Sequence, residues 1–157
     1  MLERKRKLDC ANGREKADLV LKNGNVLNVF TEEVLKADVA ICGDTIVGVG
    51  EYEGKEEIDC TGKYLVPGFI DAHMHIESCM AAPGELAKVL AKAGTTTIIA
   101  DPHEIVNVSG TKGMDYFLKC AAKLLVNVFF MVPSAVPATY VETNGCGEFL
   151  ASDEICG

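Results

Sequence analysis

The chain has 157 residues, 48% of them hydrophobic, and a formal net charge of -8 at neutral pH. This length suits one ordinary domain, or a small domain with part of another, and the apolar content is enough for a buried core. The negative charge argues against a nucleic-acid partner, because phosphate binding requires clustered lysine and arginine side chains.

Cysteine usage and hydropathy predict a cytoplasmic protein without a membrane partner. The seven cysteines form no Cys-x-x-Cys pair and are scattered through apolar segments, which is typical of reduced, buried thiols rather than a disulfide framework. No apolar stretch approaches the roughly 20 residues that span a bilayer, and the N-terminus lacks the apolar region of a secretory signal.

The first third of the chain predicts a polar lead-in and a small β unit. Residues 1–17 are mostly polar and are interpreted as a frayed segment or a short helix. Residues 18–66 hold short β-type runs, with Asn23-Gly24 and Gly43-Asp44 as turn signals between them. We therefore expect a small antiparallel unit over residues 18–66, whose short strands need cover from elsewhere.

Two histidines follow the next predicted strand. The run Tyr64–Ile70 reads as a strand interrupted by a Pro-Gly pair, and His73 and His75 come just after it. Side chains at i and i+2 of an extended segment project to the same side, so both imidazoles can bind one metal ion. The alternative is a pair of surface or packed histidines, but the flanking acidic residues Asp71 and Glu77 favour a metal site.

Beyond Glu77 the hydrophobic period changes from two to 3.6, which indicates helices alternating with strands. A helix is predicted from Pro83 to Ala93, a buried strand over Thr95–Ala100, a helix over Thr111–Leu125 and a strand over Val126–Val132. The order strand, helix, strand, helix, strand is that of βαβ units with a parallel sheet.

Polar residues gather directly after each of these strands. They are His73 and His75 after the first, Asp101, His103 and Glu104 after the second, and Ser134 and Thr139 after the third. In α/β barrels and open sheets, functional sites form at the carboxyl ends of the strands. We therefore expect the residues of 101–104 to lie on the same rim as the two histidines.

Four segments resemble a known family. The segment Val66-Pro67-Gly68-Phe69-Ile70-Asp71-Ala72-His73-Met74-His75 is similar to the first barrel strand of the amidohydrolase superfamily. Three further segments narrow the resemblance to its adenine deaminase branch: residues 75–78 (His-Ile-Glu-Ser), residues 94–105 with Asp-Pro-His-Glu-Ile, and residues 131–139 with Pro-Ser-x-Val-Pro-Ala-Thr.

The resemblance implies an α/β fold in two parts. A small β-sandwich part, residues 18–66, precedes the first βαβαβ units of an incomplete TIM-like barrel, residues 67–157. A closed eight-stranded barrel needs roughly 250 residues. In the superfamily, later strands carry further metal ligands and a catalytic aspartate. The chain is therefore expected to be the N-terminal portion of such an enzyme.

The resemblance also implies hydrolysis of adenine to hypoxanthine and ammonia with divalent metal ions, manganese foremost and iron or zinc as alternatives. His73 and His75 match the family's metal ligands. Glu104 is the candidate catalytic residue, and Glu77 and His103 are candidates for substrate binding. The alternative is structural: Glu104 as a first-turn helix carboxylate and His103 as a loop histidine bonded to the backbone.

Two functional hypotheses follow for a chain of this length. In the first, it is part of a deaminase that a second chain or a homo-oligomer completes. In the second, it is a catalytically inactive fragment that associates with a partner.

Overall fold

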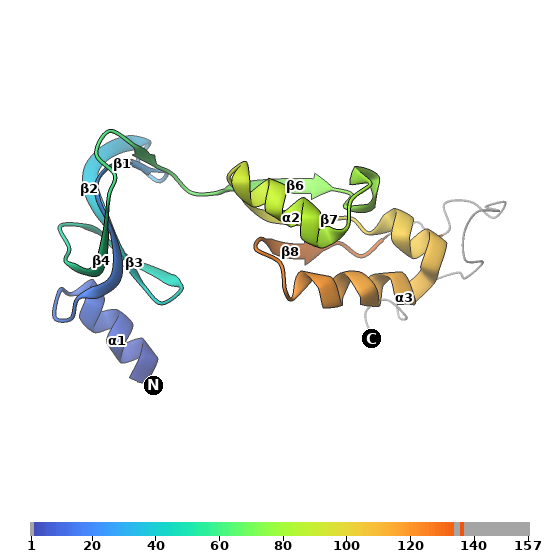
Figure 1. Ribbon diagram of the computed structural model, residues 1–157, viewed down its shortest axis with the longest axis horizontal. Helices are drawn as coiled ribbons and strands as arrows, with labels where there is room; N and C mark the ends of the chain where they lie inside the picture. The colour runs from blue at the N-terminus through green and yellow to red at the C-terminus, as the bar shows by residue number, and fades with distance from the viewer. Residues whose placement is uncertain (1, 134–135, 137–157) are drawn as a thin grey trace. The chain divides into compact units, whose positions relative to one another are not determined.

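The structure is a computed structural model that describes residues 2–133 and residue 136. The chain divides into two compact units, the first ending at Pro67 and the second beginning at Gly68, and each is described by itself (Figure 1). Ser134 and Thr139, predicted to follow the third strand, lie outside the described residues.

The first unit is a helix and one mixed sheet. Its elements are α1 (Leu2–Ala11), β1 (Ala17–Asn28), β2 (Glu33–Cys42), β3 (Thr45–Gly50), β4 (Gly54–Asp59) and β5 (Tyr64–Leu65). The sheet order is β3-β2-β1-β4, and β5 also pairs with β1. The described residues of the first unit form one sheet, and the β-sandwich expected over residues 18–66 stays a prediction.

The prediction of an antiparallel unit is correct for the first three strands and wrong for β4 and β5. Strand β2 pairs antiparallel with β1 and β3, whereas β4 and β5 both pair parallel with β1. Alternating hydrophobicity reports which face of a strand is buried and leaves its direction open. The chain after β3 crosses to the free edge of β1 instead of folding back as a hairpin.

A buried carboxylate holds this crossover. The predicted turn at Asn23-Gly24 is instead an irregularity inside the long strand β1, with Asn23 at φ 60°. Asp38 accepts hydrogen bonds from the N–H groups of Asn23 (2.9 Å) and Tyr52 (3.2 Å), and Lys22 Nζ lies 2.5 Å from it. One side chain therefore fixes both the bulge in β1 and the start of the crossover.

The stability of the first unit is expected to fall in acid. The reason is that carboxylates such as Asp38 accept hydrogen bonds in the folded state that they lose in the unfolded state. Burial alone would raise the pKa of Asp38, but the bonds from Lys22, Asn23 and Tyr52 outweigh it and lower this pKa. The stabilisation is complete above the unfolded-state pKa, about 3.9, and disappears as the pH falls through the folded-state value.

Urea unfolding followed by circular dichroism from about pH 7 to about pH 3 measures this slope. Asp38→Asn should flatten it, whereas Glu33→Gln, a change at an exposed carboxylate of the same sheet, should leave it steep. An equal slope in wild type and Asp38→Asn would contradict the assignment.

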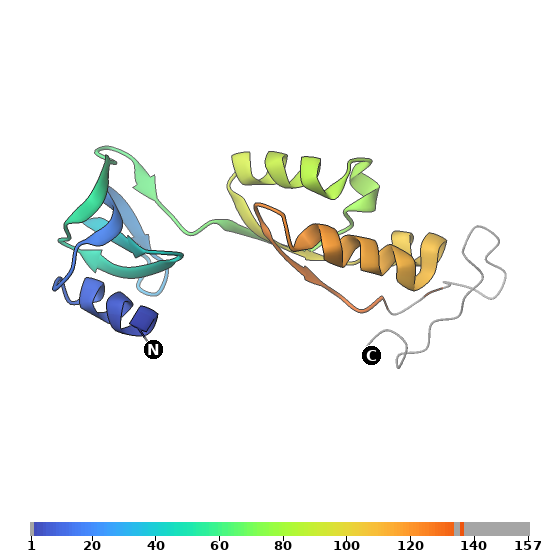
Figure 2. The ribbon, with the colours of Figure 1, turned by 60° about the horizontal axis from the view of Figure 1, so that its bottom comes forward.

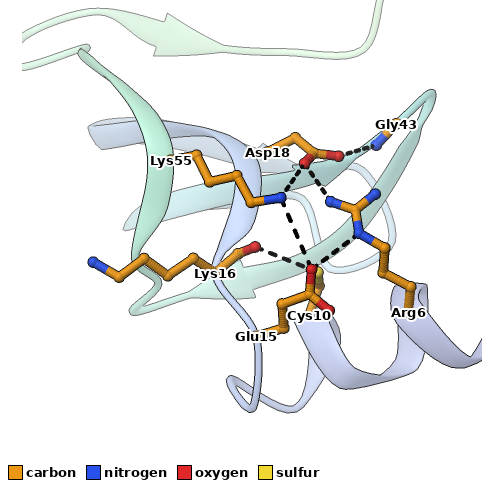
Figure 3. A network of polar contacts seen from close by, with 7 residues as sticks. All are labelled: Arg6, Cys10, Glu15, Lys16, Asp18, Gly43 and Lys55. Atoms are coloured by element: carbon orange, nitrogen blue, oxygen red, sulfur yellow. Dashed lines mark hydrogen bonds and ion pairs between the residues drawn. The ribbon is translucent and has the colours of Figure 1, made fainter.

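Helix α1 is attached to the sheet by charged side chains (Figure 3). Arg6 donates through Nε to Glu15 at 3.0 Å and through its terminal nitrogen to Asp18. Asp18 also accepts from Lys55 Nζ at 3.1 Å and from the Gly43 N–H at 2.9 Å. These bonds lower the pKa of Asp18 well below its ordinary value, Arg6 contributing most.

Cys10 is the buried anchor of the same helix. Its side chain is fully buried and Sγ donates to the Lys16 carbonyl at 3.6 Å. Burial raises the pKa of this thiol to about 11, so it is an unreactive packing group.

The second unit is a parallel sheet in the predicted βαβ order, and its two α-helices lie on one face of that sheet. Its elements are β6 (Phe69–Met74), the 3₁₀ helix η1 (Glu77–Cys79), α2 (Pro83–Lys92), β7 (Thr95–Ala100), α3 (His103–Ala121) and β8 (Asn127–Phe130). The strand order is β6-β7-β8 with both pairings parallel. Figure 2 shows α2 and α3 side by side over this sheet.

The core of the second unit lies between its sheet and its helices. Ile98 and Ala100 of β7 are buried against Phe117 of α3, whose ring stacks on Phe130 of β8 with centroids 6.0 Å apart. Pro83 begins α2 as expected. Gly94 follows the end of this helix at φ 89°, a conformation that favours glycine. This packing fixes where the three strands end.

Helix α3 begins earlier than predicted. The expected start at Thr111 marks only its second part, because a segment from His103 precedes it and the two meet at a kink at Gly110, φ 56°. His103 and Glu104 consequently lie in a first helical turn.

The run predicted as one strand over Tyr64–Ile70 is two strands. Its Pro67-Gly68 pair separates β5, which belongs to the first sheet, from β6, which belongs to the second. Within the part of the chain that the structure describes, no helix has the length and apolar character needed to cross a bilayer.

Candidate metal centre

The two histidines converge at the carboxyl end of β6. His73 is the penultimate residue of the strand and His75 the first residue after it. Their ring centroids lie 5.1 Å apart in an edge-on arrangement. The spacing of two in an extended segment therefore brings both imidazoles to one side, as the sequence predicted.

The neighbouring strand β7 adds a carboxylate to this pair. The N–H of Asp101, the first residue after β7, donates to the Met74 carbonyl at 2.9 Å, between the two histidines in sequence. Ligand atoms of His73, His75 and Asp101 all lie within 4.8 Å of one another. Asp101 was expected on this rim but not as a metal ligand, and its position directly after a buried strand is the signal in the sequence that points to it.

These three residues fit a divalent metal ion. The Oδ1 atom of Asp101 is buried and has no hydrogen-bond partner among the described residues, and an unpaired buried carboxylate oxygen is costly unless a cation or donor meets it. Two imidazoles and one carboxylate are a donor set used for zinc, iron and similar ions, with room left for water or substrate.

Glu104 contacts one of the histidines. Its Oε2 lies 2.7 Å from His75 Nδ1, and its Oε1 accepts a hydrogen bond from Ser78 Oγ at 2.8 Å. The hydrogen bond with Glu104 raises the pKa of His75. Burial works to raise the pKa of Glu104, but hydrogen bonds, that of Ser78 foremost, lower it on balance. The carboxylate is therefore ionised at neutral pH.

The other two candidates are placed differently. Glu77 Oε1 accepts a hydrogen bond from the Ile105 N–H at 2.9 Å and so caps the start of α3, where Pro102 offers no side-chain cap. Its Oε2 is buried without a hydrogen-bond partner among the described residues. His103 opens α3 and is partly exposed, but it is not one of the converging ligands.

The first unit contains a separate hollow of about 950 Å³, lined by lysine and glutamate side chains around Lys22 and Asp38. These two residues are paired with each other, which gives them a structural role in the crossover. The rim of the second sheet, which gathers ligand atoms and leaves one unpaired, is the stronger candidate for chemistry.

Comparison with protein families and curated proteins gives consistent matches. The profile of the amidohydrolase family matches residues 64–154. The chain is 58% identical over 139 residues to the adenine deaminase of Desulfitobacterium hafniense (strain Y51), covering 88% of this chain and 24% of that protein. It is 49% identical over 158 residues to the adenine deaminase of Clostridium acetobutylicum, covering 96% of this chain and 28% of that protein. It thus spans about a quarter of these relatives.

Solved structures match the fold. The N-acyl-D-glutamate deacylase from Bordetella bronchiseptica, determined with zinc and a phosphonate inhibitor, has a TM-score of 0.61 at 20% identity, covering 78% of this chain and 30% of that one. A D-aminoacylase has a TM-score of 0.59 at 25% identity, covering 76% and 30%. In both cases the chain superimposes on less than a third of the solved protein.

Proposed function

The chain belongs to the amidohydrolase family, and on that premise we propose that it supplies the first metal-binding part of an adenine deaminase site. The reaction is the hydrolysis of adenine to hypoxanthine and ammonia. The adenine deaminases of Desulfitobacterium hafniense and Clostridium acetobutylicum, 58% and 49% identical to this chain, support adenine as the substrate. Because the chain spans about a quarter of their length, the remaining parts of such a site lie outside the segments compared.

The observation that carries the proposal is the convergence of potential ligand atoms of His73, His75 and Asp101 within 4.8 Å of one another. In addition, the buried Oδ1 of Asp101 finds no hydrogen-bond partner within residues 2–133 or at residue 136. Three convergent ligands from two adjacent strand ends are what a metal-dependent hydrolase needs at minimum. A bound divalent ion would supply Lewis-acid activation of water at neutral pH.

The chain's own residues divide the remaining tasks. We assign His73, His75 and Asp101 to the metal. Glu77 and His103 are proposed for contacts with the substrate. Glu77 is chosen because its buried Oε2 has no hydrogen-bond partner in the part of the chain that the structure describes, and His103 because it opens α3 beside Glu104. Glu104, the candidate catalytic residue, has both oxygens in hydrogen-bond contacts, one with His75 and one with Ser78.

Manganese is the proposed metal, with iron and zinc as alternatives, since imidazole and carboxylate ligands suit all three. We also propose a cytoplasmic location. The five cysteines among the described residues are free, as expected in a reducing compartment.

A chimera tests the proposed substrate. The matching N-terminal quarter of the Desulfitobacterium hafniense adenine deaminase is replaced by this chain, and ammonia release from adenine is measured with the parent enzyme as control. We expect the chimera to stay within about tenfold of the parent, a barrier change of about 1.4 kcal/mol. A folded, metal-containing chimera that does not act on adenine would overturn the proposal.

A second candidate function is association with a partner. Phe69 and Phe129 of the second sheet are 65% and 62% exposed. Among the described residues β8 is an edge strand, which favours pairing with another chain or a second copy. Sedimentation of the 157-residue chain distinguishes a monomer from a dimer, and metal analysis of the same sample measures bound metal. A dimer that binds no metal would favour the partner role over the metal-site role.

A further inference from the structure

We propose that Glu104 and Ser78 act as a positioning pair that fixes the ring of His75 with its proton on Nδ1, so that Nε2 is presented to the metal ion. This inference rests on the proposed metal site and assigns Glu104 a role exerted through His75.

The direction of the hydrogen bond follows from the chemistry of the two groups. An ionised carboxylate can only accept hydrogen bonds, so the 2.7 Å contact requires a proton on His75 Nδ1. In the neutral ring the other nitrogen, Nε2, then carries the lone pair that a metal needs. An imidazole without this partner exchanges between two tautomers, and only one of them offers Nε2.

The carboxylate is held from two sides. Ser78 donates to Oε1 from the 3₁₀ helix η1, at 2.8 Å. Glu104 itself lies in the first turn of α3, between the buried residues Pro102 and Val106. The Glu77 bond to the Ile105 N–H fixes the same turn. The orientation of His75 is thus tied to the start of α3, and not only to the strand that precedes it.

A carboxylate that supports a ligating histidine raises the basicity of the ring and fixes its orientation, and losing such an outer partner typically weakens metal binding 10–100-fold. A first-turn glutamate with no such partner acts only on its own helix. Glu85 provides this comparison within the same unit: it lies in the first turn of α2, is exposed, and pairs with Lys88 at 2.7 Å.

The test measures Zn²⁺ affinity of the full 157-residue chain by competition with a chromophoric chelator. Glu104→Ala is expected to weaken binding by about 10–100-fold. Glu85→Ala, the matched control, should change it by less than about twofold, because its partner is an exposed lysine. Circular dichroism verifies that each variant retains its helices.

Glu104→Gln keeps an acceptor oxygen of nearly the same shape without the charge. It is expected to recover part of the affinity that alanine loses, which a general loss of packing would not predict. Nitrogen-15 spectra of the metal-free chain, recorded at a pH where His75 is neutral, give a second readout. The Nδ1–H form should dominate in wild type, and the Nε2–H form should grow in Glu104→Ala.

The outcomes separate this inference from the proposed function. If His73→Ala abolishes Zn²⁺ binding but Glu104→Ala binds as wild type with an unchanged tautomer, the metal site stands and the positioning role is overturned. If neither variant affects Zn²⁺ binding, the metal site itself fails.

Discussion

Replacing His73 by alanine is expected to weaken divalent metal binding by more than roughly 100-fold, beyond the loss typical of an outer-shell partner. His73 is one of three residues whose potential ligand atoms converge, and the two that would remain are fewer than the three protein ligands of a typical catalytic metal site. Its substitution should cost little stability, because the side chain is exposed. His73→Ala should therefore lower the metal affinity without lowering the stability of the fold.

Metal content after gel filtration, together with chelator competition, measures the effect. His103→Ala is the matched histidine control, since His103 lies outside the converging set, and it should keep nearly wild-type affinity. Asp101→Asn should also weaken binding, because a neutral amide oxygen replaces the carboxylate. Wild-type affinity in His73→Ala would show that the ion binds elsewhere.

The 157-residue chain by itself is expected to release ammonia from adenine at least about 10⁴-fold more slowly than the chimera, since each missing acid or base group contributes about 10²–10⁴. The described residues include three that could hold a metal ion, His73, His75 and Asp101. Glu104, the carboxylate that contacts His75, has both oxygens in hydrogen bonds. In the proposed reaction, we therefore expect proton transfer to the leaving nitrogen to depend on groups other than these four residues.

Purified chain is loaded with Mn²⁺ and assayed for ammonia with adenine, with His73→Ala as the background. Steady turnover by the chain that disappears in His73→Ala would refute the expectation. It would mean that these strand ends suffice, and light scattering would then decide whether a second copy completes the site.

Much of the second unit was predictable, because its hydrophobic periods and the residues at its helix and strand ends indicate the same elements. The β-branched run Thr95–Ala100, Pro83 at a helix start and Gly94 at a helix end all lie where local physics requires them. The sequence of the first unit was less informative. Strand direction there depends on Asp38, whose partners Lys22 and Tyr52 are distant in sequence.

The sequence predicts those parts of the site whose positions depend only on where a strand ends. His73 and His75 converge because of local geometry alone. The recruitment of Asp101 depends on a backbone bond to Met74 across two strands, and the contact of Glu104 with His75 depends on an early start of α3 that a glycine at position 110 obscured. Both are tertiary effects that a single sequence does not display.

Helix α1 is joined to its sheet mainly by ion pairs of Arg6 with Asp18 and Glu15 and of Lys7 with Asp44, around the buried thiol of Cys10. Such exposed pairs respond to ionic strength, since the screening length falls from about 10 Å at 0.1 M salt to about 3 Å at 1 M. The backbone ladder between β1 and β2 is almost indifferent to added ions. We therefore expect high salt to loosen the attachment of α1 before it affects the strands. At high salt, limited proteolysis should then cleave first within residues 2–16.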